Sequence, residues 1–223
     1  MASKTSRIGK VFGGLGVLLV AGVAAGCAAP QFTYVADSSA STYFKVPYGW
    51  HKISDVSLAA QLKAPGGVLG PGSGTWDVAY DAAPAPAAVH LFSPTAIKPF
   101  AFAFVAPLSA SASSAMSYNG LRDVLLPVTS AARAAATQGK FPLTGFHLLR
   151  DTVVKPGPGV HGVWDTYTYT YPGGIIDTFD QVALTNSDNS QLYVLMVHCM
   201  AACYGQNRNQ FNTIMSSFTV RSP

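Results

Sequence analysis

Cysteine and histidine are the residues of this chain with the widest chemical repertoire, and two cysteines lie four positions apart, at Cys199 and Cys203. His198 directly precedes them. In an oxidising compartment this spacing favours a local disulfide that would fix one corner of the fold. Two free thiols are the first alternative. A metal site formed with His198 is weaker still, because zinc sites need a second, spaced pair of ligands.

The third cysteine, Cys27, follows a segment with the layout of an export signal. Residues 1–26 carry three cations among the first ten positions and then an apolar stretch from Val11 to Ala25. This is the charge and hydropathy pattern of a signal peptide. The stretch is shorter than the roughly 20 residues that a bilayer-spanning helix needs. We therefore expect export and not a permanent transmembrane anchor.

The small residues Val23-Ala24-Ala25-Gly26, just before Cys27, resemble the lipobox of bacterial lipoproteins. In that motif the thiol is acylated and the chain is cut before the cysteine, which would remove 1–26 and leave Cys27 as a lipid-bearing N-terminus. The lipid would hold the protein on the extracytoplasmic face of the cell membrane. Ordinary secretion after cleavage at an Ala-x-Ala-like site and an uncleaved signal anchor are the alternatives.

Loss of residues 1–26 would also change the charge of the protein. The full chain has 14 Lys and Arg against 10 acids, and all the acids are aspartates. Three of the cations leave with the signal peptide, so 11 remain against 10 and the mature chain is nearly neutral. Such a balance gives no basic surface of the kind that binds nucleic acid. The expected partners are the membrane, through the lipid, and an envelope protein or small ligand.

Motifs of common catalytic sites are absent from the sequence. It has no Gly-x-Ser-x-Gly, no phosphate-binding Gly-x-x-x-x-Gly-Lys, and no His-Glu-x-x-His. The five histidines are dispersed: His51, His90, His147, His161 and His198. Any of them would need an aspartate and a serine beside it in space to form a triad. We expect no catalytic residues, no cofactor and no metal ligands.

Three aspartates, Asp165, Asp177 and Asp180, flank one predicted hairpin. Two of them could pair across the hairpin as a general acid and base. Hairpin ends commonly carry solvated acids, however, so a catalytic pair is not expected here.

The rest of the sequence divides into a tether at 27–41, which lacks sustained periodicity, and one domain at 42–223. Alternation and turn residues predict the strands of the domain, and a period of 3.6 predicts its helices. The expected strands are 43–47, 50–53, 75–80, 88–92, 98–108, 145–154, 160–171, 175–184 and 191–198. The expected helices cover 54–63, 111–126, 128–137 and 204–218, with a Gly/Pro-rich loop at 64–74.

The segment 191–198 is apolar at nearly every position, which is typical of a strand covered on both faces. Helices must then lie on both sides of the sheet. The C-terminal helix can supply one cover, with Phe211 and Phe218 on its apolar stripe and Asn209 and Asn212 toward water. We expect an α+β fold, a mostly antiparallel sheet with helices on both faces, arranged as an α/β/α sandwich.

Strict alternation in 165–171 places Tyr167, Tyr169 and Tyr171 on one face of a strand and three threonines on the other. Exposed, the tyrosines could form a platform for a glycan or a protein chain. Burial under a helix is favoured, because Tyr and Thr are both good strand residues.

Two short motifs suggest a family. Tyr43-Phe44-Lys45-Val46-Pro47-Tyr48-Gly49-Trp50, together with Leu192-Tyr193-Val194-Leu195 and a helix closing on Ser217-Phe218, resembles the PsbP-like superfamily. That superfamily includes the Ran-binding protein Mog and actinobacterial lipoproteins of the LpqN type. The resemblance spans about residues 42–220 and implies a non-catalytic module that binds a protein or a ligand, with no catalytic residues to carry over. The 64–74 loop and the cysteine pair depart from simpler members.

Two hypotheses of function follow. The favoured one is a membrane-anchored extracytoplasmic lipoprotein that acts as a non-catalytic protein- or ligand-binding module. The alternative is a cell-envelope hydrolase whose site is assembled from dispersed Asp, His and Ser residues. The two differ in the surroundings of the histidines, because a triad needs both an aspartate and a nucleophile within hydrogen-bond reach of one imidazole.

Overall fold

The computed structural model describes residue 1 and residues 30–63, 76–94 and 97–221. The expected signal peptide beyond Met1, the expected lipidation site at Cys27 and the expected loop at 64–74 lie outside the described residues. The strands of the described part are β1 (Phe32–Asp37), β2 (Thr42–Pro47), β3 (His51–Lys52), β4 (Trp76–Asp81), β5 (Phe100–Pro107), β6 (Thr144–Gly157), β7 (Val160–Thr170), β8 (Ile176–Asn186), β9 (Gln191–Met200) and β10 (Thr219–Val220).

These strands form two sheets in which every pairing is antiparallel. The large sheet has the order β3-β4-β5-β9-β8-β7-β6, and the small sheet has the order β1-β2-β10. The helices are α1 (Asp55–Lys63), the 3-10 helix η1 (Ala88–Phe92), α2 (Ala110–Ala115), α3 (Tyr118–Arg122), α4 (Ser130–Gln138) and α5 (Ala201–Ser216).

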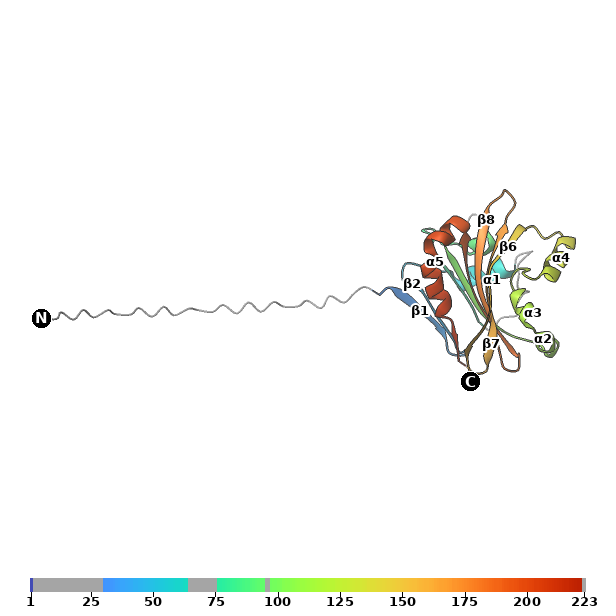
Figure 1. Ribbon diagram of the computed structural model, residues 1–223, viewed down its shortest axis with the longest axis horizontal. Coiled ribbons are helices and arrows are strands. Elements are labelled where there is room, and N and C mark those ends of the chain that lie inside the picture. Colours follow the sequence, from blue (N-terminus) through green and yellow to red (C-terminus); the bar gives the residue numbers. More distant parts are fainter. Residues whose placement is uncertain (2–29, 64–75, 95–96, 222–223) are drawn as a thin grey trace.

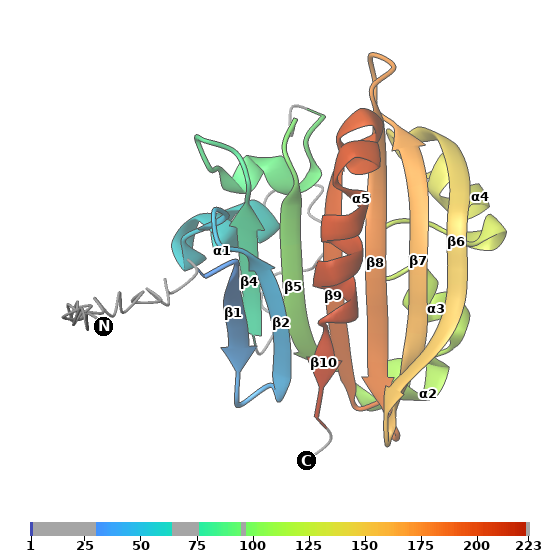
Figure 2. The ribbon, with the colours of Figure 1, turned by 60° about the vertical axis from the view of Figure 1, so that its left-hand side comes forward.

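The large sheet lies between two layers (Figures 1 and 2). Helix α5 and the small sheet cover one face, and the shorter helices cover the other. Each interface has its own hydrophobic core. This arrangement confirms the expected α+β sandwich with helices on both faces of a mostly antiparallel sheet.

Strand β9, at the centre of the large sheet, supplies both cores. Its side chains alternate between the faces and are buried on each. Tyr193, Leu195 and Val197 join the core under α5, and Leu192, Val194 and Met196 join the other. A strand with two apolar faces can be stable only between two covering layers, so the prediction from 191–198 is confirmed.

Helix α5 docks on the sheet as its apolar stripe predicts. Phe211, Ile214 and Met215 are buried, whereas Asn209 is exposed. Directly after the helix, the ring of Phe218 packs edge-on against Phe44 of β2, with 6.4 Å between ring centroids. The C-terminal helix therefore joins the small sheet to the large one. In the described part of the chain, none of the helices combines the length and hydropathy required to span a membrane.

The tyrosine-rich strand is a core element, as favoured. Tyr167, Tyr169 and Tyr171 are all buried. The ring of Tyr167 stacks on Phe179 at 5.6 Å, and the hydroxyl of Tyr169 donates a hydrogen bond to the Pro127 carbonyl. These side chains form no exposed platform, because the layer of short helices covers them.

The expected tether differs from the structure. Residues 32–37 form strand β1, which pairs with β2 from Phe32 opposite Pro47 to Asp37 opposite Thr42. The folded domain therefore begins about ten residues before the expected boundary at 42. Tyr34 is exposed and only Val35 is buried in this strand, so its local sequence carries little periodic signal. Its conformation depends on the backbone of β2.

The expected strand at 88–92 is instead the 3-10 helix η1. The carboxylate of Asp81, fully buried at the end of β4, accepts hydrogen bonds from the backbone N–H groups of Ala83 and Ala87. Nδ1 of His90 lies 2.6 Å from the same carboxylate. These contacts gather the Ala-Pro segment into a turn, which outweighs the β-propensity of Val89 and Phe92.

The expected helix at 111–126 is two short helices, α2 and α3. Met116 is extended between them, and the side chains of Ser109 and Ser117 each cap the start of one helix. Ser109 accepts from the N–H of Ala112, and Ser117 accepts from that of Gly120. Serine favours such caps over helix interiors, so a second cap interrupts the predicted run. The helices expected at 54–63 and 128–137 are confirmed by α1 and α4.

Candidate ligand-binding groove

The face of the large sheet that carries α5 is only partly covered. Helix α5 packs on β8 and β9, while β7 and β6 extend beyond it on the same face (Figure 2). Side chains from α5 on one side and from β6 and β7 on the other line two pockets, which the contact between Arg150 and Trp164 places next to each other. We call the two pockets together the groove and each of them a lobe.

The first part of the groove, the polar lobe, has a volume of about 300 Å³. It is lined by Leu149 and Arg150 of β6, Thr166 of β7, and Tyr204, Gly205 and Arg208 of α5. Strand register brings the sheet residues together, since Arg150 is opposite Thr166 and Thr166 is opposite Asp180 of β8. Cross-strand partners share a face of the sheet, so these three form a row beside α5.

Asp180 organises the polar lobe from beneath. Its carboxylate is fully buried and accepts hydrogen bonds from the indole Nε1 of Trp164 at 2.6 Å and the hydroxyl of Thr166 at 3.0 Å. The hydroxyl of Tyr204 lies 3.4 Å from the other carboxylate oxygen. Burial raises the pKa of Asp180, and the hydrogen bonds from Trp164 and Thr166 and the charge of Arg150 oppose that rise. One acceptor thus fixes three side chains of the groove.

The second part, the apolar lobe, has a volume of about 380 Å³. Its walls come from β6, β7, β8, the end of α5 and the residue before β10. The lining residues are Val154, Lys155, Pro156, Trp164, Val182, Leu184, Met215, Ser216 and Phe218. Both lobes are of a size that small-molecule sites occupy, about 300–1,000 Å³.

Trp164 and Arg150 connect the two lobes. The indole lines the apolar lobe, and the Arg150 guanidinium lies over it, 4.3 Å from the ring centroid. Arg150 itself lines the polar lobe. An indole held by Asp180 on its edge and by a guanidinium on its face is rigid and amphipathic, which suits a surface that binds a ligand.

The histidines do not assemble a triad. His90 pairs with Asp81 at 2.6 Å, and His198 pairs with Asp177 at 2.9 Å, in separate parts of the fold. In the described ranges, no hydroxyl or thiol forms a hydrogen bond with any of the five imidazoles. The geometry that the hydrolase hypothesis requires is therefore not present in this part of the chain.

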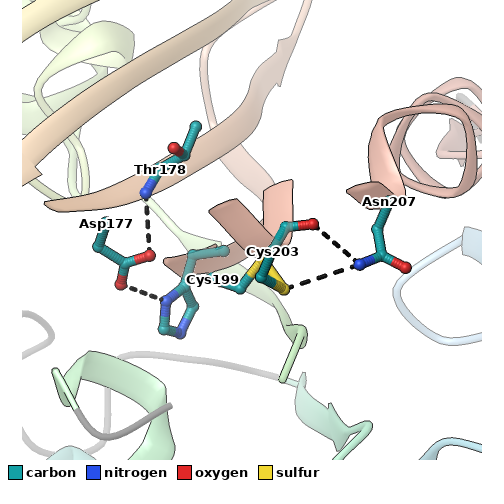
Figure 3. The surroundings of a disulfide bond; sticks show 6 residues. Asp177, Thr178, Cys199, Cys203 and Asn207 are labelled. Carbon is teal, nitrogen blue, oxygen red and sulfur yellow. Dashed lines mark hydrogen bonds and ion pairs between the residues drawn. A yellow bond between two sulfur atoms is a disulfide. The ribbon is translucent and has the colours of Figure 1, made fainter. Parts of the chain in front are cut away.

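The cysteine pair forms a disulfide, Cys199–Cys203, with 5.9 Å between the Cα atoms. Figure 3 shows it where β9 turns into α5, with the side chain of Asn207 donating to the Cys203 carbonyl at 2.8 Å. The predicted disulfide is confirmed, and it pins the first turn of α5 to the central strand. His198 faces away toward Asp177, so the alternative of a shared metal site is wrong. Across the described residues, no three His, Cys or Asp side chains cluster as metal ligands.

The three aspartates singled out in the sequence lie in three different environments. Asp180 faces the groove, and Asp177 pairs with His198 in the opposite layer. Asp165 lies opposite Asp151, whose carboxylate pairs with Arg122 at 2.9 Å. Burial, and then the charge of Asp151, raises the pKa of Asp165 to about 7. No two of the three form an acid–base pair.

Sequence reasoning singled out Asp180 but did not find the groove that it helps to form. Arg150, Tyr204, Arg208 and Asp180 come from three elements that are distant in sequence, and no motif joins them. The available signal was Trp164, a large aromatic residue within a strand of alternating Tyr and Thr. Its environment could be recognised only after the strand register had placed Asp180 and Arg150 beside it.

Comparisons with known proteins identify the fold. No family model matches the sequence, and no curated protein matches it. Among solved structures, the solution structure of cyanobacterial PsbP (CyanoP) from Synechocystis sp. PCC 6803 is similar with a TM-score of 0.50 and 12% identity, over 90% of this chain and 99% of that one. The chain has a PsbP-like fold.

Two further solved structures resemble the chain. The Ran-binding protein Mog1p of Saccharomyces cerevisiae is 9% identical with a TM-score of 0.45, over 85% of this chain and 95% of that one. LpqN of Mycobacterium tuberculosis, described as involved in cell envelope biogenesis, is 14% identical with a TM-score of 0.46, over 86% of this chain and 91% of that one.

Proposed function

We propose that the protein is an extracytoplasmic lipoprotein, anchored in the cell membrane through Cys27, whose PsbP-like domain is a non-catalytic module that binds a protein or small ligand. The support for anchoring is the charged and apolar segment 1–26 followed by the lipobox-like Val23-Ala24-Ala25-Gly26. The disulfide Cys199–Cys203 is consistent with export, because such bonds persist in oxidising compartments.

The groove beside α5 is the binding site in this proposal. The single observation that carries it is the network around Asp180, which fixes Trp164, Thr166 and Tyr204 along an open groove. Sites that bind ligands combine an apolar wall with a few oriented polar groups, and both are present here. The hydrolase alternative lacks an imidazole placed between an acid and a nucleophile among the described residues.

A photo-crosslinking residue introduced at Leu149 tests the binding function in living cells. Leu149 lines the polar lobe and is 52% exposed. Val153, on the same strand and 47% exposed, is the matched control, since its partner Val163 belongs to the core on the opposite face. We expect a discrete adduct from Leu149 and none from Val153. Equal labelling of both positions, or no adduct from either, would contradict the groove as the site.

The anchor is tested separately by Cys27→Ser. Without the thiol there is no acylation, and the exported protein should move from the membrane fraction to the soluble fraction. A variant that stays on membranes would contradict the lipoprotein assignment and leave the groove untouched, because Cys27 precedes the folded domain.

A further inference from the structure

Two arginines line the polar lobe, and the proposed binding function assigns them no role. Arg150 and Arg208 both line the lobe, one from β6 and one from α5. In the residues that the structure describes, neither forms a salt bridge. A guanidinium presents five N–H donors in a planar fork that matches a carboxylate or a phosphate.

The charge of this face of the sheet favours an anion. The groove carries Arg150, Arg208 and Lys155, while the acid beside it is Asp180. That carboxylate lies below the lining residues and is already occupied by donors from Trp164 and Thr166. An incoming anion would therefore meet guanidinium groups at the surface and no free carboxylate.

A glycine keeps the polar lobe open. Gly205 lies in the first half of α5, where glycine is less favourable than alanine because it loses more conformational freedom in a helix. Packing does not demand it, because a Cβ built at Gly205 would meet no described atom within 4 Å. Since Gly205 lines the lobe between Tyr204 and Arg208, a side chain there would take up the space that a ligand needs.

We propose that the groove binds an amphipathic anion, with its carboxylate or phosphate between Arg150 and Arg208 and its apolar portion along Trp164 into the apolar lobe. The inference rests on the proposed function and names the ligand class of that same site. Trp164 is the point where the two parts of the ligand join, because it lines the apolar lobe and carries Arg150 on its ring.

Binding of four probes to the purified full-length protein tests this ligand class. Dodecyl phosphate and dodecanoate carry the two anionic groups, dodecyl maltoside has the same chain with a neutral head, and inorganic phosphate is the head group alone. All amphiphiles are used below their micelle concentrations. We expect each anionic amphiphile to bind at least about tenfold more tightly than the other two probes, because charge-assisted hydrogen bonds strengthen its binding. The anionic probe that binds more tightly shows whether the site prefers a phosphate or a carboxylate.

Variants locate the site. The double substitution Arg150→Gln/Arg208→Gln should weaken the anionic amphiphiles about tenfold or more and leave dodecyl maltoside unchanged. Arg133→Gln is the matched control, since Arg133 also lies over an aromatic ring, that of Phe146 at 4.0 Å, but in the opposite layer. Gly205→Leu should abolish binding of the anionic amphiphiles while the protein stays folded, because leucine favours a helix more than glycine does.

The outcomes separate this inference from the proposed function. Equal affinity for the neutral and anionic amphiphiles, an unchanged double variant, or no binding of any probe would each overturn the anionic ligand. The adduct at Leu149 in cells decides independently whether the groove binds a partner at all. An adduct at Leu149 without binding of the probes would leave the groove as a binding site and remove the anion from it.

Discussion

Asp180 and Asp165 lie on neighbouring strands, β8 and β7, but on opposite faces of the large sheet, and their surroundings differ. Both carboxyl groups are fully buried. Asp180 accepts hydrogen bonds from Trp164 and Thr166, whereas Asp165 lies opposite Asp151. Burial raises the pKa of both, and hydrogen bonds oppose the rise only for Asp180.

The difference shows what each face of the sheet requires. On the α5 face, a buried acid is paired with donors and thereby holds the side chains of an open groove. On the other face, short helices and stacked rings such as Tyr167 and Phe179 fill the layer, and Asp165 has no hydrogen-bond donor among the described residues but a pKa raised to about 7. A buried carboxyl is stable either with donors or in its neutral form, and this sheet contains both solutions.

The largest expected effect tests whether α5 packs on the large sheet as part of the core. Phe211→Ala removes a fully buried ring from α5 and should lower the free energy of unfolding by about 3–5 kcal/mol. Chemical denaturation measures this loss. Asn209→Ala, on the exposed side of the same helix, should change stability by less than about 0.5 kcal/mol. Similar stabilities for the two variants would mean that α5 is not a core element.

The second prediction concerns the pH dependence that Asp165 adds. Its folded pKa of about 7 is above the ordinary value of 3.8, so the folded state binds the proton more tightly. The resulting stability is complete at pH values below about 4 and is lost as pH rises through about 7, with a slope of at most about 1.4 kcal/mol per pH unit. The free energy of unfolding of the parent and of Asp165→Asn, measured across pH 4–8, should depend less steeply on pH in the variant. The same pH dependence in both proteins would contradict a raised pKa at Asp165.

Replacement by asparagine should change the stability of the protein in opposite directions at Asp180 and Asp165. Asp180→Asn replaces the charged acceptor of the Trp164 indole and the Thr166 hydroxyl, and should cost about 1.5–3 kcal/mol near neutral pH. Asp165→Asn should stabilise the protein at pH 8, where the buried carboxyl would otherwise ionise. Denaturation midpoints of the two variants, measured side by side at pH 8, give the comparison. Equal shifts of the same sign would show that the two faces treat a buried acid alike.

The last prediction concerns the corner where α5 begins. Cys199→Ser/Cys203→Ser opens the short loop that the disulfide closes and should cost about 2 kcal/mol on the chain-entropy model. Thermal unfolding of the double variant measures it. Mass spectrometry of the unreduced, alkylated protein provides the control, because both thiols should be blocked. Two alkylated thiols in the parent protein would contradict the disulfide.

Much of the fold follows from local sequence. The apolar run 191–198 predicted a strand between two layers, and the stripe through Phe211 and Phe218 predicted a docked helix. The Tyr/Thr alternation predicted a buried strand face at 165–171. The structure differs from the sequence prediction where contacts with another part of the chain decide the local conformation. Strand β1 depends on β2, and the turn at η1 depends on the carboxylate of Asp81.

The candidate site shows the same division. By itself, the sequence determined an antiparallel sheet covered on both faces, the helix that docks on it and the close pair of cysteines, because periodicity and spacing are local properties of the chain. Only the tertiary structure decided the groove, since the register of β6, β7 and β8 and the position of α5 bring Arg150, Asp180 and Arg208 together. When the side chains of a site come from several distant elements, the spacing of residues within any single element does not reveal the site.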